Sequence, residues 1–402
     1  MFRAVCLLTL SVSTIVPAAD WPQWRGPNRD GKSEETGLLA QWPAGGPRLV
    51  WKVQGLGEGY SSFAVVGNRL YTQGQQGDEE FVLALDVATG KPVWKTPTGH
   101  ALGNDKGNGP RGTPTVDGKR LYALAGDGTF VCLETDTGKR VWKTNFVSDF
   151  KGRSPHWGYA ESPLVEGEKV IVTPGGPGAS VVALNKATGA IIWKSQSDGA
   201  AYSSAVPFDS GETHGLALLT ASAAVGLNMK NGELLWRYPN VANHTANIAT
   251  PIVRQDRIFF SSAYNTGCAL LKLTAQGGSV DASEVYFSRD MMNHYTTSVL
   301  VGDYLYGFSS SILTAMEFNT GKVAWKDRSV GKGNCIFADQ RLYCMGEGGT
   351  VGLIEPNPSA YTEKSRFEIP KGDNPTWTPP VVANGRLYLR EQDNLYSFDI
   401  KR

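Results

Sequence analysis

One pattern recurs along almost the whole chain. Two short apolar stretches are joined by a turn, and a third leads into a Thr-Gly turn that is followed by tryptophan. The pattern is clearest in residues 62–95, SFAVVGNRLYTQGQQGDEEFVLALDVATGKPVWK. Counted from Arg48 to the end of the chain, eight copies average about 44 residues each. A repeat of this period constrains the fold strongly, because each unit can bury its apolar faces only against its neighbours.

The copies vary in how completely they carry the pattern. The clear ones occupy residues 62–95, 113–143, 162–194 and 297–326, and less regular ones begin at Ser204, Thr250, Asn334 and Thr378. Within each copy the apolar residues tend to alternate with polar ones, as in a half-buried strand. With 47 glycines and only 19% charged residues, the composition suits many strands and tight turns. We therefore predict an all-β, eight-bladed propeller of four-stranded antiparallel blades.

The two ends of the repeat series are complementary. The eighth copy stops before its fourth strand, while residues 48–52, RLVWK, match the fourth strand of the other copies. We therefore expect an N-terminal strand to complete the last blade, which closes the ring and removes its open sheet edges. This assigns residues 48–402 to the propeller and residues 20–47 to an N-terminal leader packed on it. We expect Trp21, Trp24 and Trp42 to fasten the leader to the propeller's outside.

Residues 1–19, MFRAVCLLTLSVSTIVPAA, have the layout of a secretory signal peptide. The mature protein is then exported, to the periplasm or beyond the cell, and no later stretch predicts a membrane helix. The formal net charge is +1, and removing Arg3 brings it to zero. A balanced chain has no bulk electrostatic attraction to nucleic acid or anionic lipid, so we expect neither partner. We expect the mature chain to be a monomer.

Four cysteines remain after the signal, and none lies in a CxxC motif. Cys132 and Cys268 fall in apolar strand patterns and are expected to be buried. Cys335 and Cys344 flank the predicted turn Asp339-Gln340, so they face each other if this pair forms a two-residue hairpin. Export makes a disulfide between them possible. The sequence shows no metal-ligand spacing of Asp, Glu, His or Cys, and we predict no metal site.

The motif ALDVATGKPVW at residues 84–94, and FNTGKVAW at residues 318–325, resemble the tryptophan-docking repeat of pyrroloquinoline quinone (PQQ) propellers. The opening DWPQWRGPNRDG, residues 20–31, resembles the start of exported bacterial PQQ-like repeat proteins. The resemblance covers nearly the whole mature chain. It implies the propeller fold and leaves activity open, because the superfamily includes quinoprotein alcohol dehydrogenases, which bind PQQ and calcium. It also includes the outer-membrane assembly factor BamB, which binds partners and catalyses nothing.

Six tryptophans occupy the repeat position, and blade-to-blade packing explains them. These structural residues are Trp51, Trp94, Trp142, Trp193, Trp236 and Trp325. Other aromatic, amide and charged residues fall on the connections that precede the first strand of each blade. In a propeller these connections gather at one mouth of the central channel, which we predict to be the ligand-binding surface. Its predicted members are Tyr60, Arg111, Tyr159, Glu161, Tyr202, Asn247, His294, Tyr295, Lys332 and Trp377.

Three functions fit this reading. The first is a non-catalytic exported scaffold that binds a protein or peptide partner, in envelope or outer-membrane assembly, with no catalytic residue and no cofactor. The second is a PQQ-dependent oxidoreductase acting on an alcohol or sugar. In that case Arg111 and Lys332 would contact the quinone oxygens, Trp377 would stack on the quinone, and Glu161 with Asn247 would bind calcium. The third is a carbohydrate- or polymer-binding module that uses Trp157, Trp377 and the tyrosines.

Overall fold

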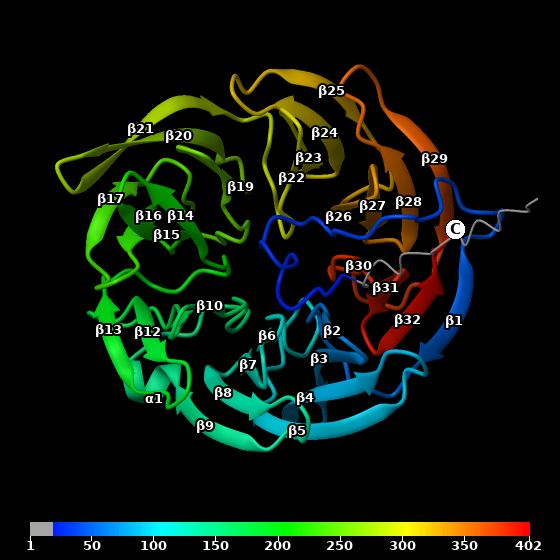
Figure 1. Ribbon diagram of the computed structural model, residues 1–402, viewed down its shortest axis with the longest axis horizontal. Helices are drawn as coiled ribbons and strands as arrows, with labels where there is room; N and C mark the ends of the chain where they lie inside the picture. Colours follow the sequence, from blue (N-terminus) through cyan, green and yellow to red (C-terminus); the bar gives the residue numbers. More distant parts are fainter. Residues whose placement is uncertain (1–18) are drawn as a thin grey trace, which may run out of the picture.

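The computed structural model describes residues 19–402, and these form a closed ring of eight four-stranded antiparallel sheets (Figure 1). In each sheet the first strand lies toward the axis of the ring and the fourth strand lies at the rim. The predicted eight-bladed propeller is confirmed. The predicted signal segment lies, apart from Ala19, outside the described residues.

The first four blades follow one another from residue 64 to residue 238. Their strands are β2 (Ala64–Val66), β3 (Arg69–Gln76), β4 (Glu79–Asp86) and β5 (Pro92–His100); β6 (Thr115–Asp117), β7 (Arg120–Leu124), β8 (Thr129–Glu134) and β9 (Arg140–Asn145); β10 (Leu164–Glu166), β11 (Lys169–Val172), β12 (Val181–Asn185) and β13 (Ile191–Ser195); and β14 (Val206–Ser210), β15 (Thr213–Leu219), β16 (Ala224–Asn228) and β17 (Leu234–Tyr238). A short helix, α1 (Phe146–Phe150), connects blades 2 and 3.

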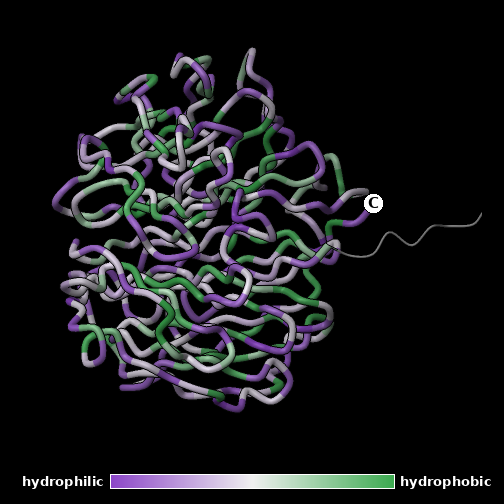
Figure 2. The backbone as a smooth tube through the Cα atoms, turned by 60° about the vertical axis from the view of Figure 1, so that its left-hand side comes forward, coloured by the Kyte–Doolittle hydropathy of each residue, from purple (hydrophilic) through white to green (hydrophobic). Residues whose placement is uncertain are grey.

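Blades 5 to 8 complete the ring. Their strands are β18 (Ile252–Arg254), β19 (Arg257–Ser262), β20 (Gly267–Gln276) and β21 (Ser279–Ser288); β22 (Val299–Val301), β23 (Tyr304–Ser309), β24 (Ile312–Glu317) and β25 (Val323–Asp327); β26 (Gly333–Ala338), β27 (Arg341–Gly346), β28 (Thr350–Glu355) and β29 (Thr362–Glu368); and β30 (Val381–Ala383), β31 (Arg386–Glu391) and β32 (Asn394–Asp399), joined by β1 (Arg48–Val53). Short hydrophobic stretches alternate with hydrophilic ones along the backbone of residues 19–402 (Figure 2). Among residues 19–402, none of the helices is both long and apolar enough to cross a bilayer.

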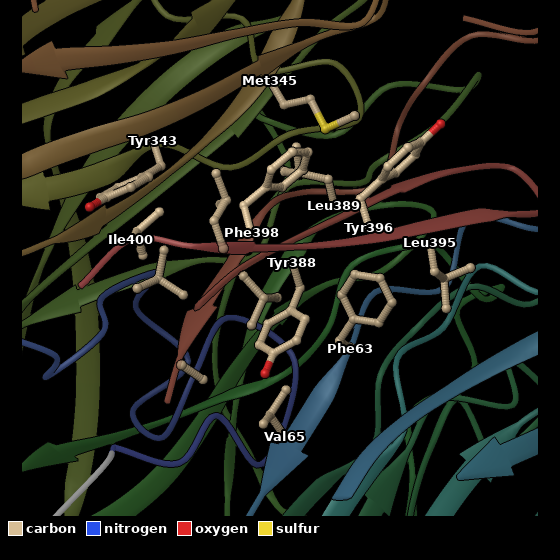
Figure 3. Packing of buried hydrophobic residues seen from close by; sticks show 14 of the residues in the cluster. Phe63, Val65, Tyr343, Met345, Tyr388, Leu389, Leu395, Tyr396, Phe398 and Ile400 are labelled. Carbon is tan, nitrogen blue, oxygen red and sulfur yellow. The ribbon is translucent and has the colours of Figure 1, made fainter. Parts of the chain in front are cut away.

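The last blade is built from both ends of the propeller. Strand β1 pairs antiparallel with β32, with Arg48 opposite Asp399 and Val53 opposite Leu395. This confirms the predicted closure. Blade 8 is then covered on both sides, because Tyr388, Leu395 and Phe398 lie between Phe63 of the blade 1 side and Met345 of blade 7 (Figure 3).

The repeated tryptophan joins six of the eight blades to the next. The indole Nε1 of Trp51 donates to the carbonyl oxygen of Val87, 2.9 Å away, and Trp94 makes the same contact with Thr135 at 2.9 Å. The ring of Trp51 lies so close to Gly90 that a Cβ there would come within 2.8 Å of it. Gly90 also has φ of +71°, so both the turn and the docked ring require glycine. The Thr-Gly-Lys turn and the tryptophan are thus two halves of one contact between neighbouring blades.

Blade 5 departs from this pattern. It has no Thr-Gly turn, and strands β20 and β21 form a long hairpin of ten residues each. The Nε1 of Trp236, which faces this blade, is buried without a hydrogen-bond partner. On the other side, Tyr286 takes the tryptophan position and donates to the carbonyl oxygen of Phe318 at 3.0 Å. Trp236 still packs between Phe208 and Phe260, so it remains a core residue.

The hydrogen-bonded and the unpaired indoles predict different losses of stability when tryptophan is replaced by phenylalanine. Trp325→Phe removes an indole that donates to Asn357 at 2.7 Å, whereas Trp236→Phe removes a buried N–H that is unpaired. Both variants lose similar ring volume, so the difference isolates the hydrogen bond. We expect Trp325→Phe to lower the free energy of unfolding by about 1 kcal/mol more than Trp236→Phe in chemical denaturation. Equal losses would show that the indole hydrogen bond is not what holds the blades together.

The leader was predicted to lie on the propeller's outside, and this prediction is wrong for most of it. Residues 19–40 run through the middle of the ring and then out between blades 7 and 8 (Figure 1). Trp21 forms a β-bridge with Val65 of the innermost strand of blade 1, and Trp24 donates to Thr250 Oγ1 at 2.8 Å. Only Trp42 reaches the rim, where it packs on Phe367 with ring centroids 5.2 Å apart.

Two buried arginines anchor the leader to backbone carbonyls of the ring. Arg25 donates to Thr297 and Ser298 at 3.2 and 2.7 Å, and Arg29 donates to Ser162 and Pro163 at 2.8 and 3.0 Å. Burial lowers the pKa of Arg25 to about 10 and that of Arg29 to about 9, so both stay charged at neutral pH. The leader therefore spans from blade 3 to blade 6 across the axis.

The four cysteines of the described residues are all buried. Cys132 and Cys268 are fully buried, as expected. Asp339 and Gln340 form the two-residue turn with φ of 41° and 63°, and Cys335 lies directly opposite Cys344. Both cysteines are free thiols in this structure, so the possible disulfide is not formed in it.

Candidate functional site

A cavity of about 630 Å³ opens at one mouth of the central channel. Its lining residues come mainly from the connections that precede the first strand of each blade. We call this cavity the cup. It is lined by Trp24, Tyr60, Lys106, Arg111, Trp157, Ala160, Ser162, Tyr202, Ser204, Thr245, Ile248, Thr250, Tyr264, His294, Tyr295, Lys332, Glu347, Pro375, Trp377 and Pro379.

Hydrogen bonds between neighbouring inter-blade connections hold the walls of the cup in place. The backbone N–H of Ser62 donates to Thr113 Oγ1 at 3.2 Å, that of Thr113 to Ser162 Oγ at 2.9 Å, and that of Ser162 to Ser204 Oγ at 2.9 Å. This explains why serine or threonine stands just before the innermost strands of these blades. The same links fix the backbone from which the neighbouring aromatic residues project.

The leader closes the channel at the opposite end. Its residues bind the turns between first and second strands: Gly67 donates to Asp20, Gly385 donates to Glu35, and Leu38 donates to Asp339. These turns lie at the far end of the short innermost strands from the cup. Trp24 reaches back from the leader to line the cup, and it also lines a much smaller cavity beside Trp21 and Arg25.

One wall of the cup is a stack of aromatic rings. Tyr60 and Tyr295 pack on Trp377 with ring centroids 5.0 and 5.5 Å away and planes inclined by 31° and 29°. The Arg111 guanidinium lies 5.0 Å from the Tyr60 ring, and Lys332 Nζ lies 5.1 Å from the Tyr295 ring. Cations at both tyrosines favour this arrangement through their attraction to the ring faces.

The charges of the cup are largely paired. Glu347 Oε1 accepts from Trp377 Nε1 at 2.6 Å and lies 3.1 Å from Lys332 Nζ. Arg111 donates to the carbonyl oxygens of Gly107 and Gly109, each at 3.0 Å. Arg111 thus shapes its own loop, and its donors are mostly engaged.

His294 and Tyr295 contribute neutral polar groups. Burial, with Lys332 nearby, lowers the pKa of His294 to about 4, so the imidazole is uncharged at neutral pH. Its Nε2 lies 2.9 Å from the hydroxyl of Tyr264. Burial raises the pKa of Tyr295 well above its usual range. Neither group is poised to act as a base near pH 7.

The structure brings seven of the ten predicted mouth residues together and places three elsewhere. Tyr60, Arg111, Tyr202, His294, Tyr295, Lys332 and Trp377 line the cup. Tyr159 instead packs on Phe146 in the core and donates to the carbonyl oxygen of Pro174 at 2.9 Å. Glu161 accepts from the backbone of Thr173, and Asn247 is bonded to its own loop and to Thr220. These three side chains lie outside the cup, because alternate residues of a connection point away from the axis.

Several residues that line the cup were not among the predicted mouth residues. Tyr264 and Glu347 come from turns between second and third strands, which lie on the same face as the inter-blade connections. Following the alternation of hairpin turns along the chain would have found them. Trp24 comes from the leader, and nothing in its sequence signals that it lines the channel.

The nominated residues do not fit PQQ with calcium. Glu161 and Asn247, the nominated calcium ligands, are buried and hydrogen-bonded outside the cup, and burial raises the pKa of Glu161 to about 7. Among residues 19–402, no group of three or more His, Cys, Asp or Glu side chains could hold a metal ion. Trp377, the nominated stacking residue, already packs against Tyr60 and Tyr295.

Comparisons with known proteins identify relatives of the whole propeller. The chain is 28% identical over 398 residues to the outer membrane protein assembly factor BamB of Burkholderia pseudomallei, covering 92% of both chains. The structure resembles BamB from Moraxella catarrhalis, with a TM-score of 0.62 at 15% identity, covering 88% of this chain and 98% of that one. It also resembles a europium-containing methanol dehydrogenase, with a TM-score of 0.70 at 11% identity, covering 94% and 90%. These two structural likenesses concern the fold.

A family model described as outer membrane protein assembly factor BamB matches residues 34–129 and 78–327. Together these segments include the closing strand and the repeats of blades 1 to 6. The chain therefore belongs to the BamB family of PQQ-like β-propellers.

Proposed function

We propose that this protein is a non-catalytic scaffold of the cell envelope that binds a protein or peptide partner in the cup. The observation that carries the proposal is a cavity of about 630 Å³ that aromatic residues from several inter-blade connections line. Tyrosine and tryptophan give large contact areas at little entropic cost, and they are enriched where proteins bind one another. Membership of the BamB family supports a partner in the envelope.

The chemistry of the cup supports binding rather than catalysis. The pKa of His294 lies near 4. Glu347, the one carboxylate that lines the cup among the described residues, is paired with Lys332. Arg111 donates its hydrogen bonds to its own loop. A general acid or base works best with a pKa near the operating pH, and His294 is far from that condition at pH 7.

Site-specific photo-crosslinking tests the proposal. A benzophenone amino acid would replace Lys106, an exposed residue that lines the cup, in the protein expressed in its native host. A matched control replaces Lys119, an exposed lysine in the turn on the opposite face, and a second replaces Ile191 on the rim strand β13. We expect a discrete envelope protein to be captured from Lys106 and not from the two controls. Capture from Ile191 without capture from Lys106 would move the partner to the rim and refute the proposal.

A further inference from the structure

One pair of opposite positions distinguishes blade 7 from most other blades. In five blades a proline stands three residues before the end of the first strand, and an apolar residue of the second strand lies opposite, as Leu216 does for Pro207. These prolines are Pro114, Pro163, Pro207, Pro251 and Pro380. In blade 7 the same two positions hold Cys335 and Cys344, which are direct partners of strands β26 and β27.

The two cysteines form a pair without backbone hydrogen bonds between them. The N–H and the carbonyl oxygen of Phe337 bond to Gly31 and Ser33 of the leader, at 2.9 and 2.8 Å, so they point away from β27. Hydrogen-bonded and non-hydrogen-bonded pairs alternate along an antiparallel ladder. Cys335, two residues before Phe337, therefore also turns its backbone groups away from Cys344.

This kind of pair has the spacing that a disulfide needs. The Cα atoms of a non-hydrogen-bonded pair lie about 4.5 Å apart, and those of a disulfide about 4.4–6.8 Å. Both side chains also lie on the same face of the sheet, because both pack with Tyr306 in the core between blades 6 and 7. The Sγ of Cys335 lies 3.5 Å from the carbonyl oxygen of Tyr306. The bond thus requires no rearrangement of the backbone.

The folded ring shields these thiols from reagents. Cys335 is 2% exposed and Cys344 is 0% exposed. Burial, with the Cys335 thiol beside it, raises the pKa of Cys344 well above its usual range. The thiolate is the species that attacks a disulfide, so the two thiols react slowly once blade 6 covers them. A two-strand hairpin forms quickly from local contacts, which gives the pair an earlier opportunity to react.

We propose that Cys335 and Cys344 are a cross-strand disulfide site, oxidised while blade 7 folds and then enclosed under blade 6. The proposal rests on the export that the proposed envelope function also requires, because disulfides persist in oxidising compartments. Two S–H bonds break and one S–S bond forms. The two electrons and two protons pass to a disulfide-bearing oxidant, which is reduced to two thiols.

The bond acts on the strand that holds the leader. Strand β26 pairs with β27 on one side, and on the other side its Phe337 bonds to Gly31 and Ser33. A slip of one residue between β26 and β27 would turn the Phe337 backbone groups toward β27. A covalent link between Cys335 and Cys344 forbids that slip, so it keeps the leader's binding groups directed toward the channel.

The oxidation state of the cysteines tests the proposal. The full-length protein would be isolated from its native host with a maleimide present, denatured, and labelled before and after reduction. We expect Cys132 and Cys268 to take the label before reduction, and Cys335 and Cys344 only after it. Mass spectrometry of a digest should find the two peptides linked. Labelling of all four before reduction, or a bond between other cysteines, would overturn the proposal.

Matched variants measure what the bond contributes. The double variant Cys335→Ala, Cys344→Ala cannot form it, whereas Cys132→Ala removes a buried thiol that lies opposite Tyr122. We expect a reductant to lower the melting temperature of the parent and of Cys132→Ala, because the linked chain loses its bond when it unfolds. The melting temperature of the double variant should not respond. An equal response in the double variant would contradict the proposal, and the labelling result decides if that variant does not fold.

This proposal and the proposed function can fail separately. Free thiols in a protein whose Lys106 position still captures a partner would refute the disulfide and leave the scaffold function standing. A linked pair in a protein that captures no partner would refute the scaffold function alone.

Discussion

A chain that lacks residues 20–53 is expected to lose cooperative unfolding or to aggregate. The deletion removes β1, which leaves β32 of the last blade as an open edge, and it also empties the channel of Arg25 and Arg29. An unpaired strand is a template for association with other chains. Trp21 and Leu38, each no more than 2% exposed, would be lost with it and their neighbours uncovered. Differential scanning calorimetry against a chain that starts at Asp20 is the measurement.

A shorter deletion separates the two causes. Removing residues 20–40 keeps β1 and takes away only the part of the leader that crosses the ring. We expect this chain to unfold cooperatively at a lower temperature, since the ring remains closed. Cooperative melting of the longer deletion near the parent temperature would show that β1 does not close the propeller.

Stability should fall as the pH rises from about 4.5 to about 7. Glu80 and Glu161 are almost fully buried, and burial raises the pKa of each to about 7 from 4.5. In the unfolded chain both carboxyls lose their protons near pH 4.5, so between pH 4.5 and 7 the folded state binds more protons than the unfolded state. The destabilisation is absent below pH 4.5 and complete above pH 7. It is on the order of 3 kcal/mol for each group.

Glutamine substitutions isolate this contribution. Glu80 accepts from the backbone N–H of Gly126 at 2.7 Å and Glu161 from that of Thr173 at 2.5 Å, and an amide oxygen can accept the same bonds. The double variant Glu80→Gln, Glu161→Gln should therefore gain stability over the parent at pH 8 and differ little from it at pH 5. Denaturant titrations at the two pH values measure this. A double variant with the parent's pH dependence would place the ionisation elsewhere.

The repeat made the ring predictable because its signature residues contact each other. The ring of Trp51 packs directly on Gly90, and the corresponding tryptophan and glycine pairs repeat this contact in several other blades. The path of the leader could not be predicted in this way. Arg25 and Arg29 bind backbone carbonyls, and a carbonyl oxygen is the same whatever residue carries it. Any position in the ring would have looked equally suitable.

The cup was predictable at the level of connections and not of side chains. Residues 159–162 lie on a mouth connection, as expected, but Ala160 and Ser162 line the cup while Tyr159 and Glu161 turn away from it. Neighbouring residues in extended backbone point in opposite directions, so an error of one position reverses the assignment. The prediction placed the aromatic and charged residues of this connection at the cup because of their chemical type, whereas alanine and serine line it.

The anchoring of the leader also bears on the order of folding. Arg29 bonds to Ser162, 133 residues away, Arg25 to Ser298, 273 away, and Ser33 to Val382, 349 away. The segment that leaves the ribosome early thus has no docking site until the ring around it exists. Contacts so distant in sequence form slowly, because the loops that they close carry a large entropic cost. We therefore expect the leader to be the last part of the propeller to settle, once the blades that bind it have assembled.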